Sequence, residues 1–468
     1  MRREKELVKN TLILSISMFV PKISSMITLP IITAYVSKTE LGTFDLIGTI
    51  ACLLLPLITL QIQTAAFRFL IDVRNNQDKT ECIISTIFFF VLFVSSISIV
   101  IIFFCLYKLD MLIRILMSLY FLTYITVTTL QQVARGISKN EVYSLSAVVQ
   151  TFFNVTLIIL FVMFMQMGLR GLLISSIVSS LSADFVLLLK GDIVGRISIK
   201  KISLNKLKEM LSYSWPMVPN SLSLWVMSLS DRLVITSFLG LEANAIYAIA
   251  NKIPLLFDSV QATFIQAWQE NASISSRDFD SNEYYSKMFD SVSCILSGLM
   301  CILVAFTPLI FKLFIRGEYI ESYYQMPLLF MGMLFSCLSS FLGGIYVAFK
   351  RTKNVGITTS VAALINLILD FLLINKIGIF AGSISTLISY FALLIYRMWD
   401  VLRFQNIKYD ICHLFILLLV PSIMCVLCFI NNPILNIFNC LIGCIFSLLF
   451  NKQIIMVFVK NLKKRRIR

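Results

Sequence analysis

Long apolar stretches separated by short polar segments dominate the chain. A stretch of about 20 apolar residues has the length of a helix that crosses the hydrocarbon core of a bilayer. The pattern predicts an all-α polytopic membrane protein with about 14 transmembrane helices. The predicted spans lie near residues 11–36, 43–66, 82–107, 111–133, 142–165, 169–189, 213–239, 243–268, 288–314, 323–349, 355–375, 378–399, 411–430 and 434–458.

The distribution of basic residues predicts how these spans are oriented. Of the 40 Lys and Arg residues, 30 fall in the two termini and the loops on one side, and 7 fall in the alternate loops. Cytoplasmic loops of membrane proteins are enriched in Lys and Arg. We therefore expect an even number of spans, with the N- and C-termini both in the cytoplasm.

An internal repeat divides the predicted bundle. Residues 31–44 and 234–247 align at a constant offset of 203, which places Thr33 over Thr236 and Phe44 over Tyr247. Each segment closes the first span of a half and opens the second, so the repeat is parallel. We expect two six-helix lobes related by this repeat, plus two C-terminal helices. The expected parts are a lobe over 1–190, a basic cytoplasmic linker over 191–212, a lobe over 213–400, and two additional transmembrane helices with a basic tail over 401–468.

Composition and charge exclude several classes of protein. Only 14% of the residues are charged, whereas a soluble domain carries about 25%. The basic residues that give the net charge of +15 lie between the spans and at the two termini. They form no basic face interleaved with aromatics, so we expect no nucleic-acid partner. The eleven cysteines show no disulfide framework, and His413 is the single histidine, which excludes a histidine-rich metal site. We expect no catalytic residues, no metal and no cofactor.

Two segments carry a family resemblance. Residues 10–47 (NTLILSISMFVPKISSMITLPIITAYVSKTELGTFDLI) and 207–253 (LKEMLSYSWPMVPNSLSLWVMSLSDRLVITSFLGLEANAIYAIANKI) resemble the bacterial polysaccharide transporter family. These O-antigen-type flippases are part of the multidrug/oligosaccharidyl-lipid/polysaccharide exporter superfamily. Near residues 35–37 the chain departs from the commonest family pattern, which leaves the subfamily open.

The resemblance implies a function in polysaccharide biosynthesis, for O-antigen, lipopolysaccharide or capsule. The substrate would be an oligosaccharide repeat unit linked to undecaprenyl pyrophosphate, moved across the bacterial inner membrane by alternating access of the two lobes. The implied partners are this lipid-linked oligosaccharide, the lipid bilayer, a polysaccharide polymerase and a chain-length regulator.

Charged side chains within or beside the spans are the candidate site residues, because each costs about 2.5–3.5 kcal/mol to insert. Basic ones from spans one, two, seven and eight could pair with an anionic pyrophosphate. The candidates for substrate binding are Lys22, Arg68, Arg232, Lys252, Asp45, Asp231 and Asp258. Asp184 and Asp370 are candidates for carrying a coupling proton or cation through a raised pKa.

Other interpretations remain open at the sequence level. Arg232 could extend to the outer interface, and Arg68 could be an ordinary inside charge. The protein could instead be a cation-coupled multidrug exporter of related fold, which would predict twelve spans and an acid-centred cavity. An integral-membrane polysaccharide polymerase or glycosyltransferase would be expected to show a large outer loop or acids clustered at an interface. The basic candidate set favours the flippase.

Overall fold

The computed structural model describes residues 2–107, 109–276 and 278–452, and for residues 2–16, 256, 258–260, 262, 263, 266 and 352 it describes only the backbone. The chain divides into two compact units, Met1–Trp225 and Val226–Arg468, which we call the N-terminal and C-terminal units. The boundary falls inside helix α9 (Val218–Leu239). Each unit is described by itself.

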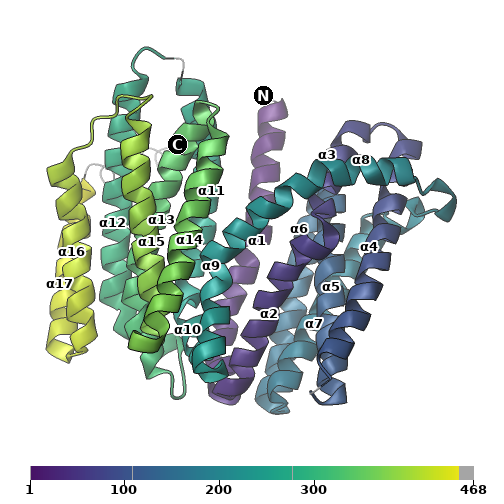
Figure 1. Ribbon diagram of the computed structural model, residues 1–468, viewed down its shortest axis with the longest axis horizontal. Helices are drawn as coiled ribbons and strands as arrows, with labels where there is room; N and C mark the ends of the chain where they lie inside the picture. Colours follow the sequence, from purple (N-terminus) through teal and green to yellow (C-terminus); the bar gives the residue numbers. More distant parts are fainter. Residues whose placement is uncertain (1, 108, 277, 453–468) are drawn as a thin grey trace, which may run out of the picture. The chain divides into compact units, whose positions relative to one another are not determined.

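In the described residues of the N-terminal unit, every element of regular secondary structure is a helix (Figure 1). Its elements are α1 (Arg2–Tyr35), α2 (Lys38–Thr59), α3 (Ile62–Val73), α4 (Gln77–Cys105), α5 (Met111–Gly136), α6 (Asn140–Ile158), the π-helix η1 (Ile159–Phe164), α7 (Gly168–Lys190), the 3₁₀ turns η2 (Val194–Arg196) and η3 (Ile199–Lys201), α8 (Leu204–Ser214) and η4 (Trp215–Met217).

The short helix α3 packs against α4, α5 and α8. Ile62, Ala65, Ala66 and Leu70 are fully buried, and their spacing places them on one face of the helix. The side chain of Leu70 lies against Gly136 at the end of α5, where an added Cβ would approach Leu70 Cβ to 2.8 Å. Small residues therefore allow α3 and α5 to approach closely.

The C-terminal unit continues from α9 and is also helical. Its further elements are α10 (Leu241–Ala250), α11 (Lys252–Ser275), α12 (Ser281–Phe314), α13 (Ile320–Ala348), α14 (Thr352–Ile377), α15 (Phe380–Val401), α16 (Ile411–Ile430) and α17 (Pro433–Phe450). Helix α13 packs against α10, α11, α12, α14, α15 and α16. In its most apolar stretch, 83% of the residues are buried. Helix α13 is therefore the core of this unit, and α16 and α17 pack together beside α12 (Figure 1).

Each of the two repeat segments contains a junction between two helices. Ser37 is the N-cap of α2, and its hydroxyl forms a capping box with Glu40. At the same offset of 203, Gly240 is the N-cap of α10, with φ at 89°, a conformation that glycine adopts without a steric penalty. Each aligned segment thus contains a break between two helices, although the backbone conformation of the two caps differs.

The predicted all-α polytopic class is confirmed. Among the described residues, 13 helices are long and apolar enough to cross a membrane. The expected second span, 43–66, ends earlier, because Leu60 and Gln61 adopt left-handed backbone angles between α2 and α3. The expected eighth span, 243–268, is divided at Asn251 into α10 and α11. Pro254 supplies no N–H to the carbonyl of Ala250, so a continuous helix is disfavoured there.

Candidate functional site

Polar side chains in the interior of the C-terminal unit surround the carboxylate of Asp231 on α9. The Tyr247 hydroxyl donates to Asp231 Oδ2 at 2.5 Å, and the Thr386 hydroxyl donates to the same oxygen at 2.9 Å. In the amide orientation that pairs each donor with an acceptor, Asn366 donates to Asp231 Oδ1 at 3.1 Å. Asp231 is only 4% exposed, so these donors replace water around its carboxylate.

Asp370 supplies a second carboxylate, one helical turn after Asn366 on α14. The Ser385 hydroxyl donates to Asp370 Oδ1 at 2.5 Å. Asp370 is 1% exposed, and it lies close enough to Asp231 for the two carboxyl groups to interact electrostatically. Within the described part of the chain, neither acid has a Lys or Arg side chain within ion-pair distance. We call these side chains the acidic cluster: Asp231, Tyr247, Asn366, Asp370, Ser385 and Thr386.

Three members of the acidic cluster, Asp231, Tyr247 and Thr386, line a cavity of about 60 Å³ together with Asn251 and Ser336. A single water molecule needs about 10–15 Å³ by a comparable measure, so the cavity can admit a small ion or water. Carboxylate, amide and hydroxyl oxygens are the ligands that hard cations prefer. Two adjacent carboxylates can instead share one proton, because both do not readily ionise together. The arrangement can therefore hold a hard cation or a proton.

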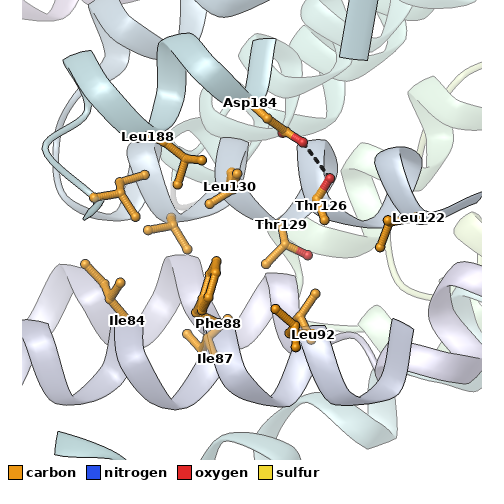
Figure 2. Close-up of a pocket in the computed structure, with 13 residues that line it drawn as sticks. Ile84, Ile87, Phe88, Leu92, Leu122, Thr126, Thr129, Leu130, Asp184 and Leu188 are labelled. Carbon is orange, nitrogen blue, oxygen red and sulfur yellow. Dashed lines mark hydrogen bonds between the residues drawn. The ribbon is translucent and has the colours of Figure 1, made fainter. Parts of the chain in front are cut away.

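A different environment surrounds Asp184 in the N-terminal unit. The Thr126 hydroxyl of α5 donates to Asp184 Oδ2 at 2.6 Å, and Oδ1 has no hydrogen-bond partner among the described residues. Figure 2 shows the carboxyl group at the edge of a pocket between α4, α5 and α7. The pocket has a volume of about 240 Å³ and mostly aliphatic walls. Phe88, Leu130 and Leu188 belong to these walls. The two predicted coupling acids, Asp184 and Asp370, thus belong to different units.

The predicted basic residues have unlike surroundings. Lys22 lies half-buried in α1, and in the described part of the chain no carboxylate lies within ion-pair distance of it. Arg68 is exposed on α3 and forms an ion pair with Asp72 at 2.5 Å, and this partner raises the pKa of its guanidinium. Arg232 is 8% exposed on α9, and Lys252 is half-buried at the start of α11.

The remaining two candidates add little to the geometry. Asp45 is half-buried on α2. The side chain of Asp258 lies outside the described residues, so its predicted role is not addressed by the structure. Since the seven substrate-binding candidates come from both units, a lumen lined by all of them stays a prediction.

The sequence singled out Asp231 and Asp370 but assigned them to different roles. The structure brings them together and adds Tyr247, Asn366, Ser385 and Thr386, which sequence reasoning missed. One signal was present, because Asn366 and Asp370 are four residues apart within an apolar run and therefore share one helix face. Neutral polar side chains occur in many transmembrane helices, so this signal alone does not identify a site.

The sequence of the chain matches a known protein family. The family model described as polysaccharide biosynthesis protein matches residues 7–269, which is more than half of the chain. The chain belongs to this family. No curated protein matches it in sequence. Membership in the polysaccharide biosynthesis protein family agrees with the resemblance drawn from residues 10–47 and 207–253.

Solved structures share the fold of the chain at low sequence identity. The lipid II flippase MurJ in an inward closed conformation is 14% identical, with a TM-score of 0.72 over 97% of this chain and 99% of that chain. An inward-facing multidrug resistance MATE family transporter of the MOP superfamily is 14% identical, with a TM-score of 0.69 over 84% of this chain and 98% of that chain. A MOP superfamily transporter from Pyrococcus furiosus is 12% identical, with a TM-score of 0.56 over 84% of this chain and 95% of that chain. The family member described here is thus a multi-pass membrane protein with the fold of these transporters.

Proposed function

We propose that the protein is a flippase for a lipid-linked oligosaccharide, namely a sugar repeat unit of O-antigen or capsule type carried on undecaprenyl pyrophosphate. It moves this substrate from the inner to the outer leaflet of the bacterial inner membrane by alternating access. The observation that carries the proposal is membership in the polysaccharide biosynthesis protein family. The fold shared with a lipid II flippase supports it. A polysaccharide polymerase and a chain-length regulator are the partners proposed to act on the exported unit.

The pyrophosphate of this substrate needs cationic partners in a site of low dielectric constant. Lys22 supports such a role, because it is half-buried and has no carboxylate within ion-pair distance among the described residues. Arg232 and Lys252 are the corresponding cations proposed for the C-terminal unit. Arg68 is the weakest member of the set, since Asp72 already neutralises it.

The acidic cluster is proposed to couple this movement to a cation or proton gradient. An ion can drive a conformational change only if it binds one state more tightly than another. Asp231 and Asp370 lie on α9 and α14, while Tyr247 and Thr386 lie on α10 and α15. A small shift among these helices would change how many oxygen atoms surround the ion, so the affinity depends on the state of the protein.

Analysis of lipid-linked intermediates in a deletion strain tests the proposed substrate. We expect complete repeat units on undecaprenyl pyrophosphate to accumulate in the inner leaflet, and a plasmid copy of the wild-type gene should restore normal levels. The measurement is mass spectrometry of the lipid extract together with labelling of the sugars from the outside. Normal amounts and normal sidedness in the deletion strain would contradict the proposal.

Export of a lipophilic drug cation is the second candidate function. The acidic cluster, without a basic side chain within ion-pair distance in the described residues, favours it, and so does the fold shared with a multidrug resistance transporter. The same deletion strain distinguishes the two. If the protein is a drug exporter, the deletion strain should accumulate more of a fluorescent lipophilic cation, with unchanged lipid-linked sugars. If it is a flippase, the strain should accumulate lipid-linked repeat units, with unchanged uptake of the cation.

A further inference from the structure

Three potential metal ligands meet where α16 packs on α12 in the C-terminal unit. Asp290 and Cys294 are four residues apart on α12 and therefore point from the same face. His413 lies in the first turn of α16, and the ligand atoms of the three side chains all lie within 4.8 Å of one another. The acidic cluster uses none of these residues.

The imidazole of His413 is held in a defined position. Its backbone N–H donates to Asp410, the N-cap of α16, at 2.9 Å. Its Nδ1 lies 2.6 Å from Asp290 Oδ1, and its ring stacks on Phe450 of α17 with centroids 5.6 Å apart. When Nδ1 carries the proton shared with Asp290, Nε2 is left as a lone-pair donor on the opposite edge of the ring.

That lone pair is directed towards a thiol. Cys294 Sγ lies 3.9 Å from His413 Nε2. Ligand atoms bound to zinc at about 2.0–2.3 Å with tetrahedral angles lie about 3.5 Å apart. A shift of a few tenths of an ångström would therefore place both atoms at bonding distance from one ion. A carboxylate that accepts from the other ring nitrogen is the usual support of a metal-bound histidine.

We propose that Cys294 and His413 bind a borderline-soft transition metal ion of the Zn²⁺ class, with Asp290 as the positioning carboxylate. Binding replaces the thiol proton, which leaves to water, with the ion, and water completes the coordination. Cys294 is 6% exposed, whereas the side chains of His413 and Asp290 are 26% and 49% exposed. The ion can therefore arrive from solvent past Asp290 and reach the thiolate last.

Such an ion would join α16 to α12. Nearby contacts already tie α17 to the same stretch of α12, since Asn451 donates to the Cys294 carbonyl at 3.2 Å and Ser447 donates to the Gly298 carbonyl at 2.7 Å. A metal bond between α12 and α16 would add a third attachment. Because the ion binds only when both helices are packed, it would stabilise this packing.

Cobalt binding to the full chain in detergent, with an affinity tag that lacks histidine, tests the proposal. We expect one equivalent of Co²⁺ to produce a thiolate-to-cobalt charge-transfer band in the near ultraviolet that Zn²⁺ displaces. Cys294→Ser should abolish the band, and Cys412→Ser, which removes the exposed neighbouring cysteine, should retain it. Asp290→Ala should weaken binding about 10- to 100-fold.

Two controls keep the outcome decisive. Each variant is compared with the wild type for monodispersity and unfolding temperature without metal, so that loss of the band is not loss of the fold. X-ray absorption of the zinc-loaded wild-type protein should give one sulfur and one imidazole scatterer. A band that survives Cys294→Ser, or a zinc spectrum without sulfur, would overturn the proposal and leave the Asp290–His413 contact as an ion pair alone.

Discussion

At the scale of single residues, the cost of burying a charge is the main constraint on the acidic cluster. Asp231 and Asp370 are both less than 5% exposed, and no Lys or Arg pairs with either in the described residues. Buried carboxylates without a cationic partner are costly when ionised. Their burial without such a partner is explained if a bound cation or a proton supplies the missing positive charge.

Asp370→Asn should remove stabilisation by the coupling ion. Asparagine keeps the size of the side chain and its contact with Ser385 but lacks the charge. If the ion is Na⁺, the wild-type protein should unfold at a higher temperature in NaCl than in choline chloride. A Na⁺ concentration of 100 times the Kd would add about 2.7 kcal/mol to the free energy of unfolding. Asp231→Asn and Asp370→Asn should lose this difference.

Asp184→Asn is the matched control, because Asp184 is a buried acid of the other unit. It should keep the sodium effect. If the effect disappears in Asp184→Asn and survives in Asp370→Asn, the acidic cluster is not the ion site. A wild-type protein whose stability responds to pH and not to sodium would identify the bound species as a proton.

At the scale of elements, the segment between the sixth and seventh predicted spans is anchored and not free. The Ser198 N–H donates to Ser85 Oγ at 2.9 Å, and the Ser203 N–H donates to Thr86 Oγ1 at 3.1 Å. Lys201 lies 2.6 Å from a carboxylate oxygen of each of two acids at the start of α4, Asp78 and Glu81. From Leu204 the expected linker is helical as α8.

Lys201→Met should release this segment from α4. We expect limited proteolysis within residues 191–203 to become about two- to fivefold faster, as fits the modest strength of exposed ion pairs. Lys200→Met, which removes the adjacent exposed lysine, should have no effect. Equal cleavage of both variants and the wild type would show that the backbone contacts suffice.

The pH dependence of this protection follows from the pKa of Lys201. Hydrogen bonds to Asp78 and Glu81 raise that pKa from 10.5 to about 12. A raised pKa in the folded state means that the contribution is complete below 10.5 and is lost as the pH rises through about 12. Protection should therefore be constant from neutral pH to about pH 10.

At the scale of the whole molecule, the distribution of basic loops predicts the orientation in the membrane. Alkaline phosphatase inserted in the expected outer loop at residues 108–110 should be active, because the enzyme folds only outside the cytoplasm. Phosphatase inserted after Asp192 should be inactive, and green fluorescent protein fused after Arg468 should fluoresce. The reverse pattern would invert the proposed topology and the direction of transport that depends on it.

Hydropathy and charge were sufficient for the class of fold. A transmembrane helix satisfies its own backbone hydrogen bonds, so its presence depends on local composition. Thirteen expected spans correspond to such helices in the described residues. The break at Asn251 was missed because the residues around it are apolar enough for a continuous span, although Pro254 disfavours one.

The sequence by itself determined the helical membrane architecture, the repeated junction at Ser37 and Gly240, and the short set of charged residues worth considering, because each depends on local composition or on the cost of burying a charge. Only the tertiary structure decided which of those residues meet. Asp231 joins Asp370, and Cys294 joins His413, through the packing of helices that are distant in the chain. Such contacts depend on which faces pack together, and the nearly uniform apolar surface of these helices leaves that information to the folded molecule.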